Sequence, residues 1–337
     1  MLLSFSCSME DPISGGRHKV LGSKALNIPP QTSTIASHLP KAVGAAYSIG
    51  LARRYPPEHR QYPDDALVIC SFGDASANHS TAQGAFNTAA WTSYQAIPLP
   101  LLFVCEDNGI GISVETPKGW TEANFSSRPG LKYFKADGLD LYNAHRIAAE
   151  AAAYVRDRRK PAFLHLRTVR LYGHAGADVA TTYLPKAQVE QDEANDPLLH
   201  SVRLLEQAGA LNPSDAMAIY DETRARVTHV AREATKRPRL ATAQQVMASL
   251  LPPKRDCAPS NGPSAEDRAR VFGDDLKVQA DPQPMSRLIN WALTDLMLAH
   301  REIRVDGRGF GPQRRGLWCD AESDDPLWTR SRHRHLA

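Results

Sequence analysis

Two short apolar runs that each end in polar residues constrain the fold of this chain more than any other feature. The runs cover residues 66–70 and 99–105, and Gly-Asp at 73–74 and Asp-Asn-Gly at 107–109 follow them. Such short, partly β-branched runs are typical of strands buried on both faces of a parallel sheet. Between them, residues 80–91 carry Ala, Phe and Trp at helical spacing. The pattern predicts a strand–helix–strand unit in an α/β fold.

The polar residues behind the two runs predict a cation site. In a right-handed strand–helix–strand unit, both polar ends emerge at the same carboxyl edge of the sheet. The unit therefore brings the Asp74 carboxylate and the Asn108 amide together, beside the backbone carbonyl of the turn that follows. These oxygen ligands suit a hard cation such as Mg²⁺, which usually holds a diphosphate. A plain strand–turn–helix with an aspartate helix cap is the alternative for Asp74 alone.

These residues resemble the metal motif of thiamine diphosphate enzymes, in which Gly-Asp-Gly is followed, a strand and a helix later, by Asn-Asn. In this chain, residues 73–75 read Gly-Asp-Ala and residues 107–108 read Asp-Asn. Ala75 stands at the second glycine of the motif and Asp107 at the first asparagine, so both departures flank the expected ligands. The resemblance implies thiamine diphosphate and Mg²⁺ as cofactors.

Two further segments resemble one branch of this class. Residues 31–50 resemble the loop and helix upstream of the metal motif, with a helix expected over 40–54. Residues 163–178 resemble the Arg-x-x-Gly-His loop of the alpha-type decarboxylating subunit of 2-oxo acid dehydrogenases. Arg170 matches the arginine that holds the diphosphate, a task that its planar guanidinium suits. His174 matches the loop histidine near the reacting carbon, where an imidazole exchanges protons at neutral pH.

The resemblance implies a complete set of site residues. His174 is the expected catalytic residue, and Ile112 matches the bulky residue that bends the cofactor between its rings; a core isoleucine is the alternative for Ile112. The expected metal ligands are Asp74, Asn108 and the Ile110 carbonyl. The expected cofactor contacts are Gly73, Asp74, Ala75, Asn108, Ile110, Ile112 and Arg170.

For function, the resemblance implies oxidative decarboxylation of a 2-oxo acid, with 3-methyl-2-oxobutanoate favoured and pyruvate next. The cofactor accepts the electrons released with carbon dioxide. The implied partners are a beta-type subunit or domain, which supplies a glutamate that activates the cofactor, and a lipoyl-bearing acyltransferase core that receives the acyl group. A homo- or hetero-oligomer is expected. A transketolase-like enzyme and a non-catalytic truncated fragment are the alternatives, and the loop with Arg170 and His174 argues against the first.

The predicted organisation is a mostly parallel sheet domain with helices on both faces, followed by shorter segments. Residues 1–250 form the expected alpha-type domain with a truncated amino end, and helices are expected near residues 186–208 and 213–236. Residues 251–284 form the expected linker. Residues 285–305 resemble the start of a beta-type, transketolase-like pyrimidine-binding domain. Residues 306–337 keep no apolar period, which indicates either a reading-frame slip in a fused alpha–beta gene or a disordered tail.

Composition limits the partners and the compartment. A net charge of +3 over 337 residues is too small to imply a nucleic-acid partner. No apolar run approaches the roughly 20 residues that span a bilayer, so no membrane is expected. The opening residues lack the basic start of a secretion signal. Five cysteines without paired spacing are typical of reduced thiols, and a cytoplasmic location is predicted.

Overall fold

The structure, a computed structural model, describes residues 1–31, 33–53, 56–251, 262–300 and 303. The chain divides into two compact units, Met1–Ser249 and Leu250–Ala337. No helix in the described ranges is long and apolar enough to cross a bilayer.

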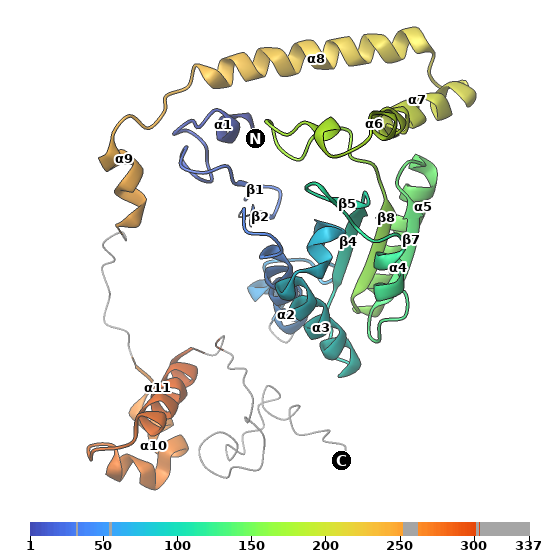
Figure 1. The fold of residues 1–337 in the computed structure, drawn as a ribbon. Helices are drawn as coiled ribbons and strands as arrows, with labels where there is room; N and C mark the ends of the chain where they lie inside the picture. Colours follow the sequence, from blue (N-terminus) through green and yellow to red (C-terminus); the bar gives the residue numbers. More distant parts are fainter. Residues whose placement is uncertain (32, 54–55, 252–261, 301–302, 304–337) are drawn as a thin grey trace. The chain divides into compact units, whose positions relative to one another are not determined.

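A four-stranded sheet forms the centre of the first unit (Figure 1). Its strands lie in the order β3-β4-β8-β7 and every neighbouring pair is parallel, so all four carboxyl ends share one edge. The strands are β3 (Val68–Gly73), β4 (Leu101–Asp107), β7 (Lys132–Asp137) and β8 (Ala162–Arg167). The predicted α/β fold with a mostly parallel sheet is confirmed.

The first two strands begin two residues later than the apolar runs predict. β4 starts at Leu101 because Pro98 and Pro100 lack the amide that a sheet ladder needs. Val68 of β3 pairs with Leu101, and its amide donates to the Pro100 carbonyl at 2.9 Å. Both strands then run on to the polar residues at the carboxyl edge.

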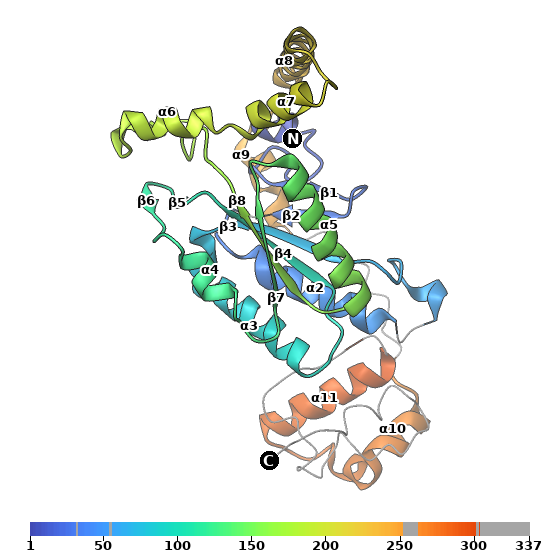
Figure 2. The same cartoon turned by 90° about the vertical axis from the view of Figure 1, so that its right-hand side faces the viewer.

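Helices cover both faces of the sheet, as Figure 2 shows. One face carries α2 (His38–Ala52), α3 (Ser80–Tyr94) and α4 (Trp120–Phe125), whose buried residues join the same core cluster as the strands. The opposite face carries α5 (Leu141–Arg158), whose Ala151 and Val155 pack against a second cluster.

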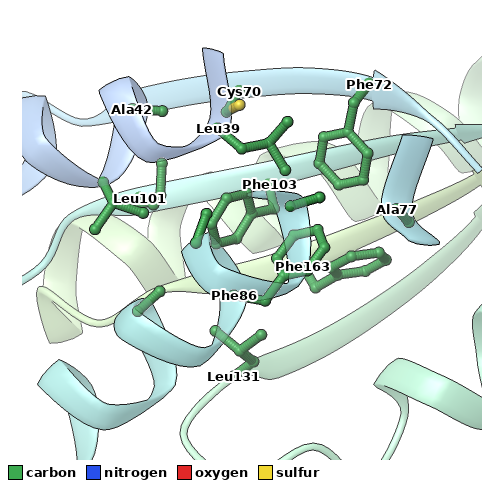
Figure 3. Packing of buried hydrophobic residues seen from close by; sticks show 14 of the residues in the cluster. Leu39, Ala42, Cys70, Phe72, Ala77, Phe86, Leu101, Phe103, Leu131 and Phe163 are labelled. Carbon is green, nitrogen blue, oxygen red and sulfur yellow. The ribbon is translucent and has the colours of Figure 1, made fainter. Parts of the chain in front are cut away.

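A cluster of phenylalanine rings fills the core under α3 (Figure 3). Phe86 of α3 is fully buried, and its ring centroid lies 4.8–5.9 Å from those of Phe72, Phe103, Phe125 and Phe163. These rings come from β3, β4, α4 and β8, so a single residue joins three strands and two helices. Tilted and edge-to-face pairs of this kind stabilise the core beyond simple burial.

The rest of the first unit consists of short elements and surface helices. They are α1 (Leu2–Phe5), the hairpin β1 (Leu21–Ser23) and β2 (Ile28–Gln31), η1 (Pro57–His59), η2 (Ala75–Asn78), the hairpin β5 (Ile110–Gly111) and β6 (Val114–Glu115), η3 (Ala180–Thr182), α6 (Lys186–Ala194), α7 (Pro197–Gln207), α8 (Pro213–Thr235) and α9 (Ala243–Met247). In the sequence, η4 (Ala248–Leu250) spans the end of the first unit and the start of the second. The amino-terminal segment is tied to the end of α8, where the Ser6 hydroxyl donates to the Ala234 carbonyl at 3.2 Å.

One predicted helix is wrong in its extent. The sequence pattern favours a continuous helix over residues 186–208, whereas the structure has α6 and α7 with a break between them. Pro197 lacks an amide hydrogen and takes the first position of α7. The Asp196 carboxylate accepts a hydrogen bond from the Leu198 amide at 2.8 Å and caps the new helix.

The second unit contains α10 (Ala265–Phe272), η5 (Gly273–Val278) and α11 (Met285–Ala299). Arg268 and Asp295 form an ion pair of 2.8 Å between α10 and α11. The range 251–284, which the sequence pattern assigns to a linker, therefore holds α10 and η5. Residues 252–261 and the predicted tail over 306–337 lie outside the described residues.

Candidate active site

Asp74 follows β3 directly and is the most deeply buried carboxylate at the carboxyl edge. It is 1% exposed, and its Oδ2 atom has no hydrogen-bond partner within the described chain. Its side chain makes no cap hydrogen bond to η2, which excludes the simple helix-cap alternative. Burial raises the pKa of Asp74, and the nearby negative charge of Asp107 raises it too. A buried carboxylate oxygen without a partner is costly unless a cation compensates it.

The turn after β4 meets the turn after β3. Burial outweighs hydrogen bonds to Asp74 from the Thr116 hydroxyl and the Asn108 backbone N–H, each of which lowers the pKa of this carboxyl. A Cβ atom added to Gly111 would collide with the Ala75 side chain, so the two turns are in van der Waals contact. The structure thus places the Asn108 turn against the turn that carries Asp74, as the strand–helix–strand unit predicts, and the ligand set itself stays a prediction.

A tight turn presents these groups. The Asn108 Oδ1 atom accepts a hydrogen bond from the Ile110 amide at 3.1 Å. Ile112 has a φ of 56°, unusual for a β-branched residue, and is 59% exposed. The alternative of a core isoleucine is therefore excluded, and Ile112 lies on the surface of the same turn. A strained residue of this kind is common in ligand-binding turns.

Arg170 joins the loop after β8 to this turn. Its Nη1 donates to the Ile112 carbonyl at 2.6 Å and its Nη2 to the Tyr183 hydroxyl at 2.7 Å. The Tyr183 hydroxyl donates in turn to Asp178 Oδ2 at 2.6 Å, and the same oxygen accepts from the His174 amide at 2.6 Å. The loop is thereby closed on itself with its arginine beside the turn. The His174 side chain is exposed.

Several neighbours of the expected residues escape the sequence pattern. Tyr183 orients Arg170, and Asp178 closes the loop through Tyr183 and the His174 amide. Both residues follow the Arg-x-x-Gly-His motif at positions that the motif does not specify, so the sequence pattern does not predict their roles. His165 lies within the apolar strand β8 and is buried, with its Nε2 atom 2.7 Å from Asp107 Oδ2. A polar residue inside an apolar run is the signal that could have identified it.

The residues at the edge fit a hard cation that carries a diphosphate. The orphaned Asp74 oxygen, an amide oxygen and a turn carbonyl are oxygen donors of the kind that Mg²⁺ accepts. Within the described residues no group of three or more His, Cys, Asp or Glu side chains gathers to hold a metal. A Mg²⁺ site that shares its ligands with phosphate oxygens does not need such a group.

Comparison with known proteins agrees with this geometry. A sequence model of the family described as "Dehydrogenase E1 component" matches residues 1–243. The chain is 30% identical over 247 residues to 2-oxoisovalerate dehydrogenase subunit alpha of Bacillus subtilis (strain 168). This aligned region covers 71% of this chain and 69% of the relative. It is 26% identical over 223 residues to the mitochondrial subunit alpha of Caenorhabditis elegans, covering 64% of this chain and 48% of the relative. For the human mitochondrial subunit alpha the identity is 24% over 212 residues, covering 62% of this chain and 44% of the relative.

The parallel sheet with its strand–helix–strand edge is the fold of thiamine diphosphate-binding proteins. The chain belongs to the dehydrogenase E1 component family, as an alpha-type member of the thiamine diphosphate-dependent 2-oxo acid dehydrogenases. It spans about two thirds of the bacterial relative and less than half of the two animal relatives.

Proposed function

We propose that this chain holds the Mg²⁺–diphosphate half of an active site that decarboxylates a branched-chain 2-oxo acid oxidatively. The buried Asp74, with its unpartnered oxygen beside the Asn108 turn, is the observation that carries this proposal. The relatives named 2-oxoisovalerate dehydrogenase support 3-methyl-2-oxobutanoate as the substrate. Pyruvate is the second choice.

Each residue of the candidate site has a separate task. Asp74 Oδ2, the Asn108 side-chain oxygen and the Ile110 carbonyl hold the cation, while Gly73 and Ala75 border the cofactor. Arg170 has five donors, of which one bonds Ile112 and one Tyr183, so it can also bind phosphate oxygens.

The remaining tasks concern the bend of the cofactor and the protons. Ile112, exposed on its strained turn, supports the bend between the two rings. His174 exchanges a proton near the reacting carbon. When bound, thiamine diphosphate supplies the nucleophilic carbon and the electron sink for decarboxylation.

The proposed partners complete the reaction. A beta-type subunit or domain contributes the activating glutamate, and a lipoyl-bearing acyltransferase core receives the acyl group in a hetero-oligomer. Residues 1–250 are the proposed alpha-type domain, residues 251–284 the connection, and residues 285–305 the start of a beta-type domain. The described cysteines are free thiols and two of the three are buried, which supports a reducing compartment such as the cytoplasm.

The test is decarboxylation with an artificial electron acceptor, by the chain alone and with an added beta-type subunit. We expect little turnover alone and turnover of 3-methyl-2-oxobutanoate above pyruvate once the subunit is present. Sugar phosphates are offered as substrates to test the transketolase-like alternative, and the Asp74→Asn variant is the inactive control. Calorimetry measures the binding of thiamine diphosphate with Mg²⁺ in parallel. Absence of cofactor binding by the wild-type chain would contradict the proposal and favour a non-catalytic fragment.

A further inference from the structure

Three side chains form a hydrogen-bonded row that runs across three neighbouring strands from the carboxyl edge into the sheet. Tyr133 of β7, His165 of β8 and Asp107 of β4 all lie on the sheet face that α4 covers. The Tyr133 hydroxyl lies 2.7 Å from His165 Nδ1, and His165 Nε2 lies 2.7 Å from Asp107 Oδ2. His165, in the middle of the row, is 7% exposed, whereas the Asp107 side chain is 21% exposed.

The direction of each hydrogen bond follows from the chemistry of its members. An aspartate is ionised at neutral pH, and Asp107 Oδ1 already accepts from the Gly109 backbone amide, so Oδ2 also acts as an acceptor. His165 therefore donates from Nε2. In the neutral ring Nδ1 is then the acceptor, and the Tyr133 hydroxyl donates to it. Burial raises the pKa of Tyr133, so its hydroxyl keeps the proton that this bond requires.

Asp107 connects this row to the candidate cation site. Gly73 pairs with Glu106 in the ladder, so Asp74 and Asp107 come directly after paired residues on adjacent strands. While Oδ2 of Asp107 is held by His165, its Oδ1 accepts from the Gly109 amide at 3.1 Å. Asp107 thus holds the turn that presents Asn108 and Ile110. It also places a second negative charge beside Asp74.

We propose that Asp107, held by His165 and Tyr133, is a positioning residue that adds a second negative charge to the cation site and holds its ligand turn. This inference rests on the proposed function. Residue 107 is an aspartate, where the motif that the segment resembles has a neutral asparagine. A second carboxylate strengthens the attraction of a divalent cation without being one of its ligands.

The test measures Mn²⁺ affinity of the full chain by electron paramagnetic resonance in the presence of thiamine diphosphate. We expect Asp107→Asn to bind Mn²⁺ about tenfold more weakly, the size of one screened charge interaction. His165→Gln keeps a donor near the Nε2 position and should stay within about threefold of the wild type. His165→Leu removes the hydrogen bond but leaves the Asp107 charge, so its loss should lie between those of His165→Gln and Asp107→Asn.

A matched control separates this effect from the general charge of the edge. Asp137 is the last residue of β7, and both Asp137 and Asp107 lie opposite Arg167 of β8 in the sheet register. The Asp137 carboxylate forms an ion pair of 2.9 Å with the Arg167 side chain. Asp137→Asn should change Mn²⁺ affinity less than twofold. Nitrogen NMR of the histidine rings provides a second readout: His165 should carry its proton on Nε2, and a proton on Nδ1 would overturn the assigned row.

Unchanged Mn²⁺ affinity in a folded Asp107→Asn variant, or an equal loss in Asp137→Asn, overturns the inference while the proposed function stands. If the wild-type chain binds neither Mn²⁺ nor thiamine diphosphate, both the proposed function and the inference fail. Circular dichroism and urea unfolding of each variant identify any loss that is due to unfolding.

Discussion

Asp74 is the residue at which stability and the proposed function conflict. Its buried oxygen without a partner destabilises the metal-free fold, yet the same oxygen is the expected cation ligand. Asp74→Asn should therefore raise the free energy of unfolding of the metal-free chain at neutral pH by about 1 kcal/mol. The same variant should lose the stabilisation that Mg²⁺ with thiamine diphosphate gives to the wild type. Urea unfolding with and without both ligands measures the two effects.

Asp140→Asn is the control for this substitution. Asp140 caps α5 by accepting from the Asn143 amide at 3.0 Å, and asparagine is an equally good cap. The control should leave both the stability and the ligand response unchanged. A metal-free Asp74→Asn variant less stable than the wild type would contradict the assignment.

The pH dependence of stability gives a second prediction at the same residue. The pKa of Asp74 in the folded state is raised above its value in the unfolded chain, which is about 3.9. The protonated Asp74 therefore contributes its full stability below pH ~3.9, and this contribution is lost as the pH rises through the folded-state pKa. The advantage of metal-free Asp74→Asn over the wild type should therefore shrink on going from pH 7 towards pH ~4. Unfolding curves of the pair across this range test the sign. Asp107, whose pKa is lowered, acts in the opposite sense, because its contribution is lost as pH falls.

Among the elements, the loop after β8 depends on Tyr183. Its hydroxyl contacts both Arg170 and Asp178, so it orients the arginine and closes the loop. Tyr183→Phe should weaken thiamine diphosphate binding about fivefold, the value of one lost hydrogen bond to a charged group, with little change in stability. Tyr172→Phe, at a residue 84% exposed in the same loop, is the control and should bind normally. Calorimetric titration compares them, and equal affinity of the two variants would contradict this role.

Helix α3 is held to the sheet by Phe86. This ring contacts four other phenylalanine rings and is fully buried, so Phe86→Ala should lower the free energy of unfolding by about 3–5 kcal/mol. Trp91→Ala on the same helix, where the side chain is 66% exposed, should change it by less than about 1 kcal/mol. Urea unfolding measures both variants. Similar losses would show that α3 does not depend on this core.

For the whole molecule, the candidate site and both core clusters lie within Met1–Ser249. A fragment of residues 1–249 should therefore fold and bind Mg²⁺ with thiamine diphosphate as the full chain does, within about twofold. Calorimetry of the fragment and the full chain makes the comparison. Loss of binding in a fragment with unchanged circular dichroism would show that the second unit contributes to the site.

The predictable part of the fold is the part whose signals are local. Buried strands produce apolar runs, and helix α3 produces a helical spacing, so the strand–helix–strand unit and the α/β fold follow from residue order. The sequence pattern does not predict the break between α6 and α7, because residues with high helix propensity lie on both sides of Pro197. The role of His165 was missed because its partners are 32 and 58 residues away in sequence.

The sequence by itself determined the class of this protein, because the motif residues at the ends of two strands follow from chain order and parallel pairing. It also predicted which residues would line the candidate site, and that set stays a prediction. Only the tertiary structure decided that Asp74 is buried with an unpartnered oxygen and that Asp107 is held through His165 to Tyr133. Both depend on contacts between strands whose side chains meet only after the sheet has formed, and no local pattern records such contacts.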